Sequence, residues 1–231
     1  MPHSEVTRVI AIRHGETAWN VDTRIQGHLD IPLNDTGRWQ ARRMAAALAD
    51  AGIDAIYASD LSRAHATAQA LADATGRPVV ADTGLRERCF GSFEGRTFAE
   101  IEAQWPEEAL RWRRRDPEFG PPGGETLRGF FERVVATASR LAAAHPGQTV
   151  AMVAHGGVLD CLYRAASRVD LLAARTWQLG NASINRLLYM PEGFTLVGWG
   201  DTMHLQGEGT LDESNDPQAV NGGSGRVGHA A

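Results

Sequence analysis

Two histidines of the sequence stand directly after apolar runs. His14, preceded by Arg13, ends the run at 9–12, and His155 ends the run at 149–154. Apolar runs of this length are typical of buried strands, and open α/β sheets bind ligands at the carboxyl ends of their strands. If the two strands are neighbours in one sheet, both imidazoles reach the same edge. The pattern therefore predicts an anion site that contains a reactive histidine.

Two further charged residues complete a candidate site for phosphoryl transfer without a metal. Arg63 falls in the first turn of a helix that we expect Ser59 and Asp60 to cap, so its guanidinium could hold two phosphate oxygens at the same edge. Glu87 falls in an irregular stretch after the third expected strand. A carboxylic acid there can protonate a leaving alkoxide and then act as a base for water.

The remaining chemistry would come from the histidines and the arginines together. A histidine accepts a phosphoryl group covalently, which divides one difficult step into two easier ones. Arg13 and Arg63, helped by His155, would stabilise the charge on the phosphoryl oxygens. Each of these residues has a structural interpretation when taken alone, as a surface arginine, a solvated glutamate or a hydrogen-bonded histidine. Their combination is what indicates a catalytic site.

The sequence pattern predicts that strands and helices alternate along the chain and position these residues. It predicts a three-layer α/β/α sandwich with a mostly parallel central sheet. Helices are expected after an Asn34 cap as far as Gly52, after Ser59 and Asp60 as far as Gly76, over 127–141 and from Val158 onward. The expected strands are 8–12, 54–58, 79–81 and 149–154, followed by a hairpin of 183–190 and 194–199.

The length of 231 residues suits a single α/β core, which we place at 1–206. Short helical pieces and glycines over about 93–123 predict a helical lid insertion that moves over the site and selects the substrate. The composition of 207–231 is polar and rich in glycine, so we expect this tail to be disordered.

Composition and charge exclude several classes of function. The net charge of −5 argues against nucleic acid as a partner. The chain has no lysine, and we derive no function from this. No apolar segment approaches the ~20 residues of a membrane span, and the first residues lack the features of a secretory signal. We therefore expect a cytoplasmic protein in which Cys89 and Cys161 are reduced thiols. The arginine run 113–115 is either a solvated helix face or the rim of an anionic substrate site.

Five blocks of the chain, in family order, resemble the histidine phosphatase superfamily, which contains the cofactor-dependent phosphoglycerate mutases. The resemblance extends from about Val6 to Gly200, and five ordered blocks are far more specific than any one of them. The blocks are Arg13 to Thr17 with Asn20, Ser59 to Ala64, Leu85 to Gly91 with Glu94 and Gly95, Gly124 to Thr126, and Ala154 to Gly156.

The resemblance implies a role for each matching residue. His14 would be the nucleophile that becomes phosphohistidine, and Glu87 would be the proton donor. No metal is implied, and 2,3-bisphosphoglycerate would be a cofactor only in a mutase. The other residues implied are Arg13, Arg63 and His155 for the phosphate pocket, and Asn20, Gln26, Gly27, Gly156, Arg113 and Arg114 for substrate binding.

Local departures from the mutase pattern favour a phosphatase. Gly157 stands where the mutases carry asparagine, and Cys89 with Phe90 stands where they carry a histidine–tyrosine pair. The resemblance thus implies a phosphomonoesterase acting on small phosphorylated metabolites. The arginine run 113–115 keeps a bisphosphoglycerate-dependent mutase as an alternative, and a non-catalytic module that binds phosphorylated ligands is a second one. The expected partner is a small phosphorylated substrate, and a homodimer is left open.

Overall fold

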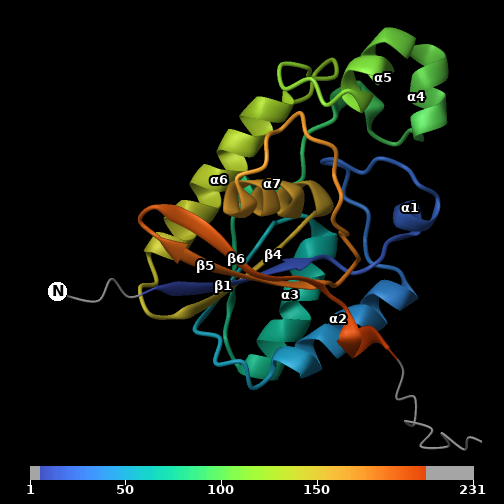
Figure 1. Cartoon of the computed structure of the whole chain (residues 1–231). Helices are drawn as coiled ribbons and strands as arrows, with labels where there is room; N and C mark the ends of the chain where they lie inside the picture. The colour runs from blue at the N-terminus through green and yellow to red at the C-terminus, as the bar shows by residue number, and fades with distance from the viewer. Residues whose placement is uncertain (1–5, 207–231) are drawn as a thin grey trace, which may run out of the picture.

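Six strands form one mixed sheet in the computed structural model, which describes residues 6–206 (Figure 1). The strand order is β3–β2–β4–β1–β5–β6. Neighbouring strands among β3, β2, β4 and β1 are parallel, whereas β5 is antiparallel to both β1 and β6. The prediction of a mostly parallel sheet is confirmed, while the expected tail at 207–231 lies outside the described residues. The strands are β1 (Thr7–Arg13), β2 (Ala55–Ala58), β3 (Val79–Ala81), β4 (Thr149–Ala154), β5 (Ile184–Met190) and β6 (Gly193–Asp201).

Helices cover both faces of the sheet, as the predicted three-layer sandwich requires. Figure 1 shows α6 (Leu127–Ala143) and α7 (Gly156–Ser167) on one face, and α2 (Asp35–Leu48) and α3 (Ser62–Thr75) on the other. Side chains of β1 alternate between the two cores: Val9 packs on the side of α6 and α7, and Ile10 on the side of α2 and α3. No helix within residues 6–206 has the length and apolar character needed to cross a membrane.

The predicted lid region contains two short helices with a small core of their own. These are α4 (Phe98–Gln104) and α5 (Pro106–Arg113), and in Figure 1 they stand away from the sheet, toward the end where α1 (Ala18–Val21) lies. Their core consists of Phe93, Ile101, Ala109 and Phe119, and it is separate from the two cores that flank the sheet. Single 3₁₀ turns occur at Thr83–Leu85, Gly91–Phe93 and Met203–Leu205.

The helix boundaries confirm one predicted cap and correct another. The Asn34 side chain accepts a hydrogen bond from the Gly37 N–H at the start of α2, as expected. Ser59 and Asp60 do not cap α3, which begins at Ser62 after Leu61 without any side-chain cap. The Ser59 hydroxyl instead accepts from the Leu61 N–H at 3.3 Å and bonds across the sheet edge, and the Asp60 carboxylate accepts from Arg86. α7 also begins at Gly156, two residues before the expected start.

Candidate active site

The parallel pairing of β1 with β4 brings the two predicted histidines together. Arg13 is in register with Ala154, so His14 and His155 follow neighbouring strands at the same edge. The His14 N–H donates to the Ala154 carbonyl at 2.9 Å, and the two imidazole centroids lie 5.2 Å apart with an interplanar angle of 61°. The expected juxtaposition of the two rings is therefore confirmed.

The ring of His14 is held with one nitrogen ready to act as a nucleophile. Its side chain is buried, and Nδ1 lies 2.6 Å from the Gly15 carbonyl oxygen. Because a carbonyl only accepts, Nδ1 carries the proton and Nε2 keeps its lone pair. Burial, reinforced by the positive charges of Arg13 and Arg63, lowers the pKa of His14 well below its usual value. The imidazole is consequently neutral at physiological pH.

A buried hydroxyl fixes the backbone next to His14. The Thr67 hydroxyl of α3 accepts from the Gly15 N–H at 3.0 Å and donates to the Arg63 carbonyl at 2.8 Å. Gly15 also passes so close to α2 that a Cβ there would lie 2.4 Å from the Gly37 carbonyl oxygen. The turn after β1 therefore requires a residue without a side chain.

The cations Arg13, which is partly buried, and Arg63, which is buried, form no ion pair within residues 6–206. Arg63 donates to the carbonyls of Gly27 and Leu29 at 2.8 and 2.9 Å, and Arg13 donates to the Leu179 carbonyl. The Nε atoms of both side chains are buried without a hydrogen-bond partner. Burial lowers the pKa of both guanidinium groups, and the nearby Glu87 charge partly opposes this. Uncompensated positive charge of this kind suits an anionic ligand.

His155 is fully buried and is hydrogen-bonded to Ser59 of the segment before α3. Its Nε2 lies 2.9 Å from the Ser59 hydroxyl oxygen, and its Nδ1 has no partner among the described residues. Burial, followed by the charge of Arg63, lowers the pKa of His155 well below its usual value. The ring therefore packs against His14 as a neutral group.

The carboxyl group of Glu87 is oriented by backbone N–H groups. Oε1 accepts from the Arg88 N–H at 2.8 Å and Oε2 from the Gly157 N–H at 2.9 Å. The Glu87 carbonyl in turn accepts from His28 Nε2 at 2.9 Å and from an Arg133 Nη at 3.2 Å. An irregular segment is thus fixed at both its backbone and its side chain, on the α7 side of the site.

A cavity of about 160 Å³ joins most of the predicted residues. Within it, the Asn20 side-chain oxygen accepts from Thr17 and Asn181, whereas no partner is present for its amide nitrogen in residues 6–206. His155 itself does not line the cavity, although its neighbour Gly156 does. The predicted residues in the lining are Arg13, His14, Asn20, Gln26, Gly27, Arg63, Glu87 and Gly156, and the unpredicted ones are Arg24, Ile25 and Phe90.

The structure does not bring Arg113 and Arg114 to this cavity. Arg113 donates to Glu102 of α4 at 2.5 Å, and its guanidinium lies 4.9 Å from the Phe98 ring centroid. Arg114 is exposed and lines neither this cavity nor its neighbour. The first arginine is held by contacts inside the lid, which explains why it does not face the site.

A second cavity of about 210 Å³ adjoins the first, and we call it the distal pocket. Glu87 and Phe90 line both cavities. Arg115, the last residue of the predicted arginine run, is part of its wall. Glu87, Phe90 and Gly157 are also named in the sequence analysis, whereas no sequence pattern predicted that Leu127, Phe130, Asp160 or Arg175 would join them. The lining is Glu87, Arg88, Phe90, Trp112, Arg115, Leu127, Phe130, Gly157, Asp160 and Arg175.

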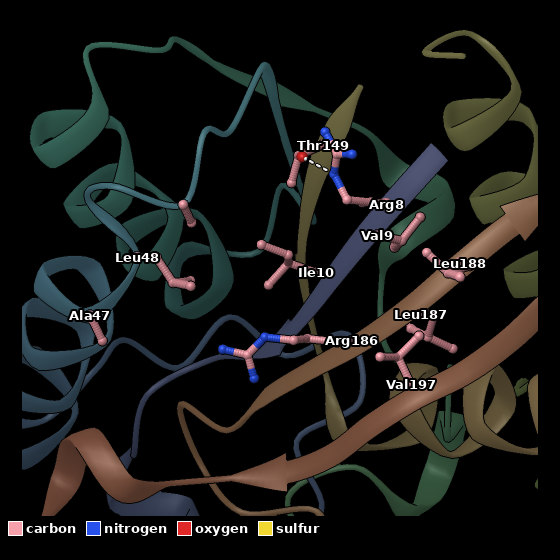
Figure 2. Close-up of a pocket in the computed structure, with 11 residues that line it drawn as sticks. Arg8, Val9, Ile10, Ala47, Leu48, Thr149, Arg186, Leu187, Leu188 and Val197 are labelled. Atoms are coloured by element: carbon pink, nitrogen blue, oxygen red, sulfur yellow. Dashed lines mark hydrogen bonds between the residues drawn. The ribbon is translucent and has the colours of Figure 1, made fainter. Parts of the chain in front are cut away.

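A further cavity, of about 280 Å³, lies at the opposite, amino-terminal ends of β1 and β4 (Figure 2). Its wall is mostly apolar. Its two arginines are both engaged, Arg8 with the Thr149 hydroxyl at 2.8 Å and Arg186 with Asp201 at 3.0 Å. None of the histidines or carboxylates predicted to be catalytic lines this cavity. The candidate active site is therefore at the carboxyl edge of the sheet.

Comparison with known proteins agrees with this placement. Residues 9–202 match the family model described as "Histidine phosphatase superfamily (branch 1)". The chain is 37% identical over 212 residues to "Phosphoglycerate mutase-like protein 4" of Arabidopsis thaliana, covering 90% of both chains. It is 34% identical over 220 residues to the "Metal-independent phosphoserine phosphatase" of the same plant, covering 94% of this chain and 90% of the relative.

A solved structure with the same fold is the mycobacterial glucosyl-3-phosphoglycerate phosphatase. It is 34% identical, with a TM-score of 0.76, and the match covers 84% of this chain and 99% of that one. Within residues 6–206 no group of three or more histidine, cysteine, aspartate or glutamate side chains is placed to hold a metal ion.

Proposed function

The chain belongs to branch 1 of the histidine phosphatase superfamily, and from this premise we propose that it hydrolyses small phosphomonoesters through a phosphohistidine at His14. One observation carries the proposal. The buried His14 donates Nδ1–H to the Gly15 carbonyl, so Nε2 keeps its lone pair beside two arginines that have no ion-pair partner among the described residues. This is the arrangement that a nucleophile needs in order to attack an anionic phosphoryl group.

In the first step, Nε2 of His14 attacks the phosphorus atom and forms a P–N bond. The P–O bond to the leaving group breaks, and its electron pair goes to the ester oxygen, which takes a proton from the Glu87 carboxyl group. Arg13 and Arg63 stabilise the negative charge on the transferring oxygens, and His155 packs against the nucleophile. The amide nitrogen of Asn20 supplies a further donor.

In the second step, water attacks the phosphorus atom of the phosphohistidine. Glu87, now a carboxylate, takes a proton from this water, and the P–N bond breaks with its electron pair returning to Nε2. Inorganic phosphate leaves, and both His14 and Glu87 are restored. The proposed mechanism uses no metal ion. The name of one relative, the "Metal-independent phosphoserine phosphatase", supports this part of the proposal.

Two features of the site support hydrolysis over phosphoryl transfer between positions of phosphoglycerate. A side chain at Gly157, where the mutases carry asparagine, would start 2.2 Å from Oε1 of Glu87. Phe90, which replaces a tyrosine of the mutases, presents no hydroxyl to the cavity. The names of two relatives, a phosphoserine phosphatase and a glucosyl-3-phosphoglycerate phosphatase, also support a hydrolase.

The proposal is tested with His14→Ala and p-nitrophenyl phosphate. We expect the wild type to release nitrophenol and to incorporate acid-labile phosphate, and the variant to lose both by a factor of at least about 10³, as is usual for a lost nucleophile. His65→Ala is the control, because His65 lies on α3 outside the cavity and makes no side-chain hydrogen bond within the described residues. Unchanged hydrolysis by His14→Ala would refute the mechanism, and a wild type that binds the ester without turnover would indicate a binding module.

A mutase remains the second candidate, because "Phosphoglycerate mutase-like protein 4" is 37% identical to this chain. The deciding assay supplies 3-phosphoglycerate with and without 2,3-bisphosphoglycerate, and it measures both 2-phosphoglycerate and free phosphate. We expect phosphate release that does not depend on the bisphosphate. Rapid isomerisation that requires the bisphosphate would establish the mutase instead.

A further inference from the structure

The distal pocket carries more positive than negative charge. Asp160 is a single buried carboxylate, and it accepts from both Arg115 and Arg164 at 2.9 Å. Arg88 donates only to the uncharged carbonyls of Phe119 and Glu125. The wall and its immediate support thus hold four guanidinium groups, those of Arg88, Arg115, Arg164 and Arg175, against the two carboxylates of Glu87 and Asp160.

Among these arginines, Arg175 differs because it has no hydrogen-bond or ion-pair partner in the part of the chain that the structure describes. It is exposed, it lines the distal pocket, and it lies near enough to Arg13 for its charge to lower the pKa of that guanidinium. Arg175 is therefore a cation without a partner among the described residues, and it lines the distal pocket next to the cavity that contains His14.

The loop that carries Arg175 is held in place by the same network. Arg115 donates to the Leu171 carbonyl at 2.8 Å, and Arg164 donates to the Asp170 carbonyl, so both arginines bound by Asp160 also hold the start of this loop. At its other end, Trp177 stacks on the Tyr163 ring with a centroid distance of 3.9 Å. Arg175 thus projects from a segment that is anchored on both sides.

The distal pocket also has an apolar part. Phe90 and Trp112, whose ring centroids are 5.5 Å apart, form the side toward the lid, and Phe130 of α6 completes it. Because Glu87 and Phe90 line both cavities, a leaving group attached to a phosphate near His14 would extend across this wall toward Arg175. The distal pocket thus offers apolar contact to a carbon skeleton, and Arg175 offers it a positive charge.

We propose that the distal pocket binds the leaving group of the substrate and that Arg175 pairs with an anionic group on it, a carboxylate or a second phosphate. The proposal rests on the proposed phosphomonoesterase activity and adds the substrate class to it. Arg175 is then a specificity-determining residue that acts on the leaving group and not on the transferred phosphoryl group.

Matched pairs of substrates test the inference by phosphate release. 3-Phosphoglycerate and glycerol 3-phosphate differ only in a carboxylate replacing a hydroxymethyl group, and fructose 1,6-bisphosphate and fructose 6-phosphate differ in a second phosphate. We expect the wild type to prefer the anionic member of at least one pair, and Arg175→Gln to lower that preference in kcat/KM by about tenfold or more, as expected for a hydrogen bond between charged groups. The pair that responds identifies the anionic group.

Two further variants make the result specific. Arg168→Gln removes the same charge from an exposed position outside both cavities, and it should keep the wild-type preference. Arg175→Lys should retain part of the preference, because it keeps the positive charge. Thermal unfolding of each variant verifies that the fold is unchanged.

Three outcomes would overturn the inference: a wild type without preference in either pair, a preference unchanged by Arg175→Gln, or an equal loss with p-nitrophenyl phosphate. Failure of the proposed function is distinguishable, because it would appear as a wild type that does not hydrolyse p-nitrophenyl phosphate or as an active His14→Ala variant.

Discussion

The Gly157 N–H donates to Oε2 of Glu87 at 2.9 Å, and a Cβ at position 157 would lie 2.2 Å from Oε1 of the same carboxyl group. The same Cβ would also lie 3.1 Å from Cε1 of Phe130. The position of the proposed general acid therefore depends on the absence of a side chain in the first turn of α7.

Gly157→Ala should displace the Glu87 carboxyl group and slow the hydrolysis of glycerol 3-phosphate by about tenfold or more, since a general acid contributes about 10²–10⁴-fold. p-Nitrophenyl phosphate should lose less, because nitrophenolate leaves without being protonated. Thermal unfolding of the variant verifies that the fold is retained. Gly198→Ala, where the Cβ meets nothing within 4 Å, is the control. An unchanged rate with glycerol 3-phosphate would contradict this role of Glu87.

The free energy of unfolding should fall as the pH drops below about 6.5, the usual histidine pKa. Burial lowers the pKa of both His14 and His155 in the folded protein, so in this window only the unfolded chain takes up protons at these positions. For each histidine, the free energy of unfolding falls by about 1.4 kcal/mol for every pH unit below 6.5, until the pH reaches the pKa of the folded state. Above pH 6.5 these histidines do not change the stability. Urea unfolding at pH 7.5, 6.5 and 5.5 should show a steeper loss for the wild type than for His14→Ala. Equal slopes would mean that His14 titrates normally.

Thr67→Val should destabilise the protein by about 1–3 kcal/mol, because it leaves the buried Gly15 N–H without an acceptor. Thr75→Val is a matched control on the same helix. Both hydroxyls donate to the carbonyl four residues earlier. That of Thr67 also accepts from the buried Gly15 N–H at 3.0 Å, whereas that of Thr75 accepts only from the exposed Arg77 N–H at 3.5 Å. We expect urea unfolding to separate the two variants and kcat to fall only for Thr67→Val. Similar losses of stability would show that the Gly15 contact contributes little.

Asp160→Asn should cost about 3 kcal/mol of stability, because it leaves two guanidinium groups without their shared carboxylate. Asp201→Asn breaks the half-exposed pair with Arg186 and should cost less than about 1 kcal/mol. Denaturant unfolding measures both. Asp160→Asn should also lower the preference for anionic leaving groups, because Arg115 and Arg164 hold the loop that carries Arg175. A mild effect like that of Asp201→Asn would argue against an anchoring role.

Local patterns were sufficient to predict the layers and the sheet edge. β4 is buried along its whole length, and a strand buried on both faces has a continuous apolar sequence. The apolar run at 149–154 therefore predicted a central strand with His155 at its end. The register of β1 on β4 then brought His155 beside His14, as expected from neighbouring parallel strands. The Asn34 cap was predictable for the same reason, since its partner Gly37 is only three residues away.

Side chains with distant partners were not predictable in this way. Serine is a preferred residue type at helix N-caps, but the Ser59 hydroxyl forms a hydrogen bond with His155, which is 96 residues away in the sequence. Arg113 pairs with Glu102 of the preceding helix and so does not face the site. Arg175 reaches the distal pocket because Arg115 and Arg164 anchor its loop, and no local pattern encodes that arrangement.

The small core of Phe93, Ile101, Ala109 and Phe119 has a consequence for how the protein opens. Because opening a segment costs only the burial that it disrupts, this part can unfold locally while the two large cores stay intact. Phe90 and Trp112 pack against the small core, and both also line the distal pocket. Amide hydrogens of α4 and α5 should then exchange with solvent through openings that leave those of β1 and β4 protected. The order of the Phe90 and Trp112 wall therefore depends on the stability of the small core, whereas the position of His14 depends on the stability of the sheet.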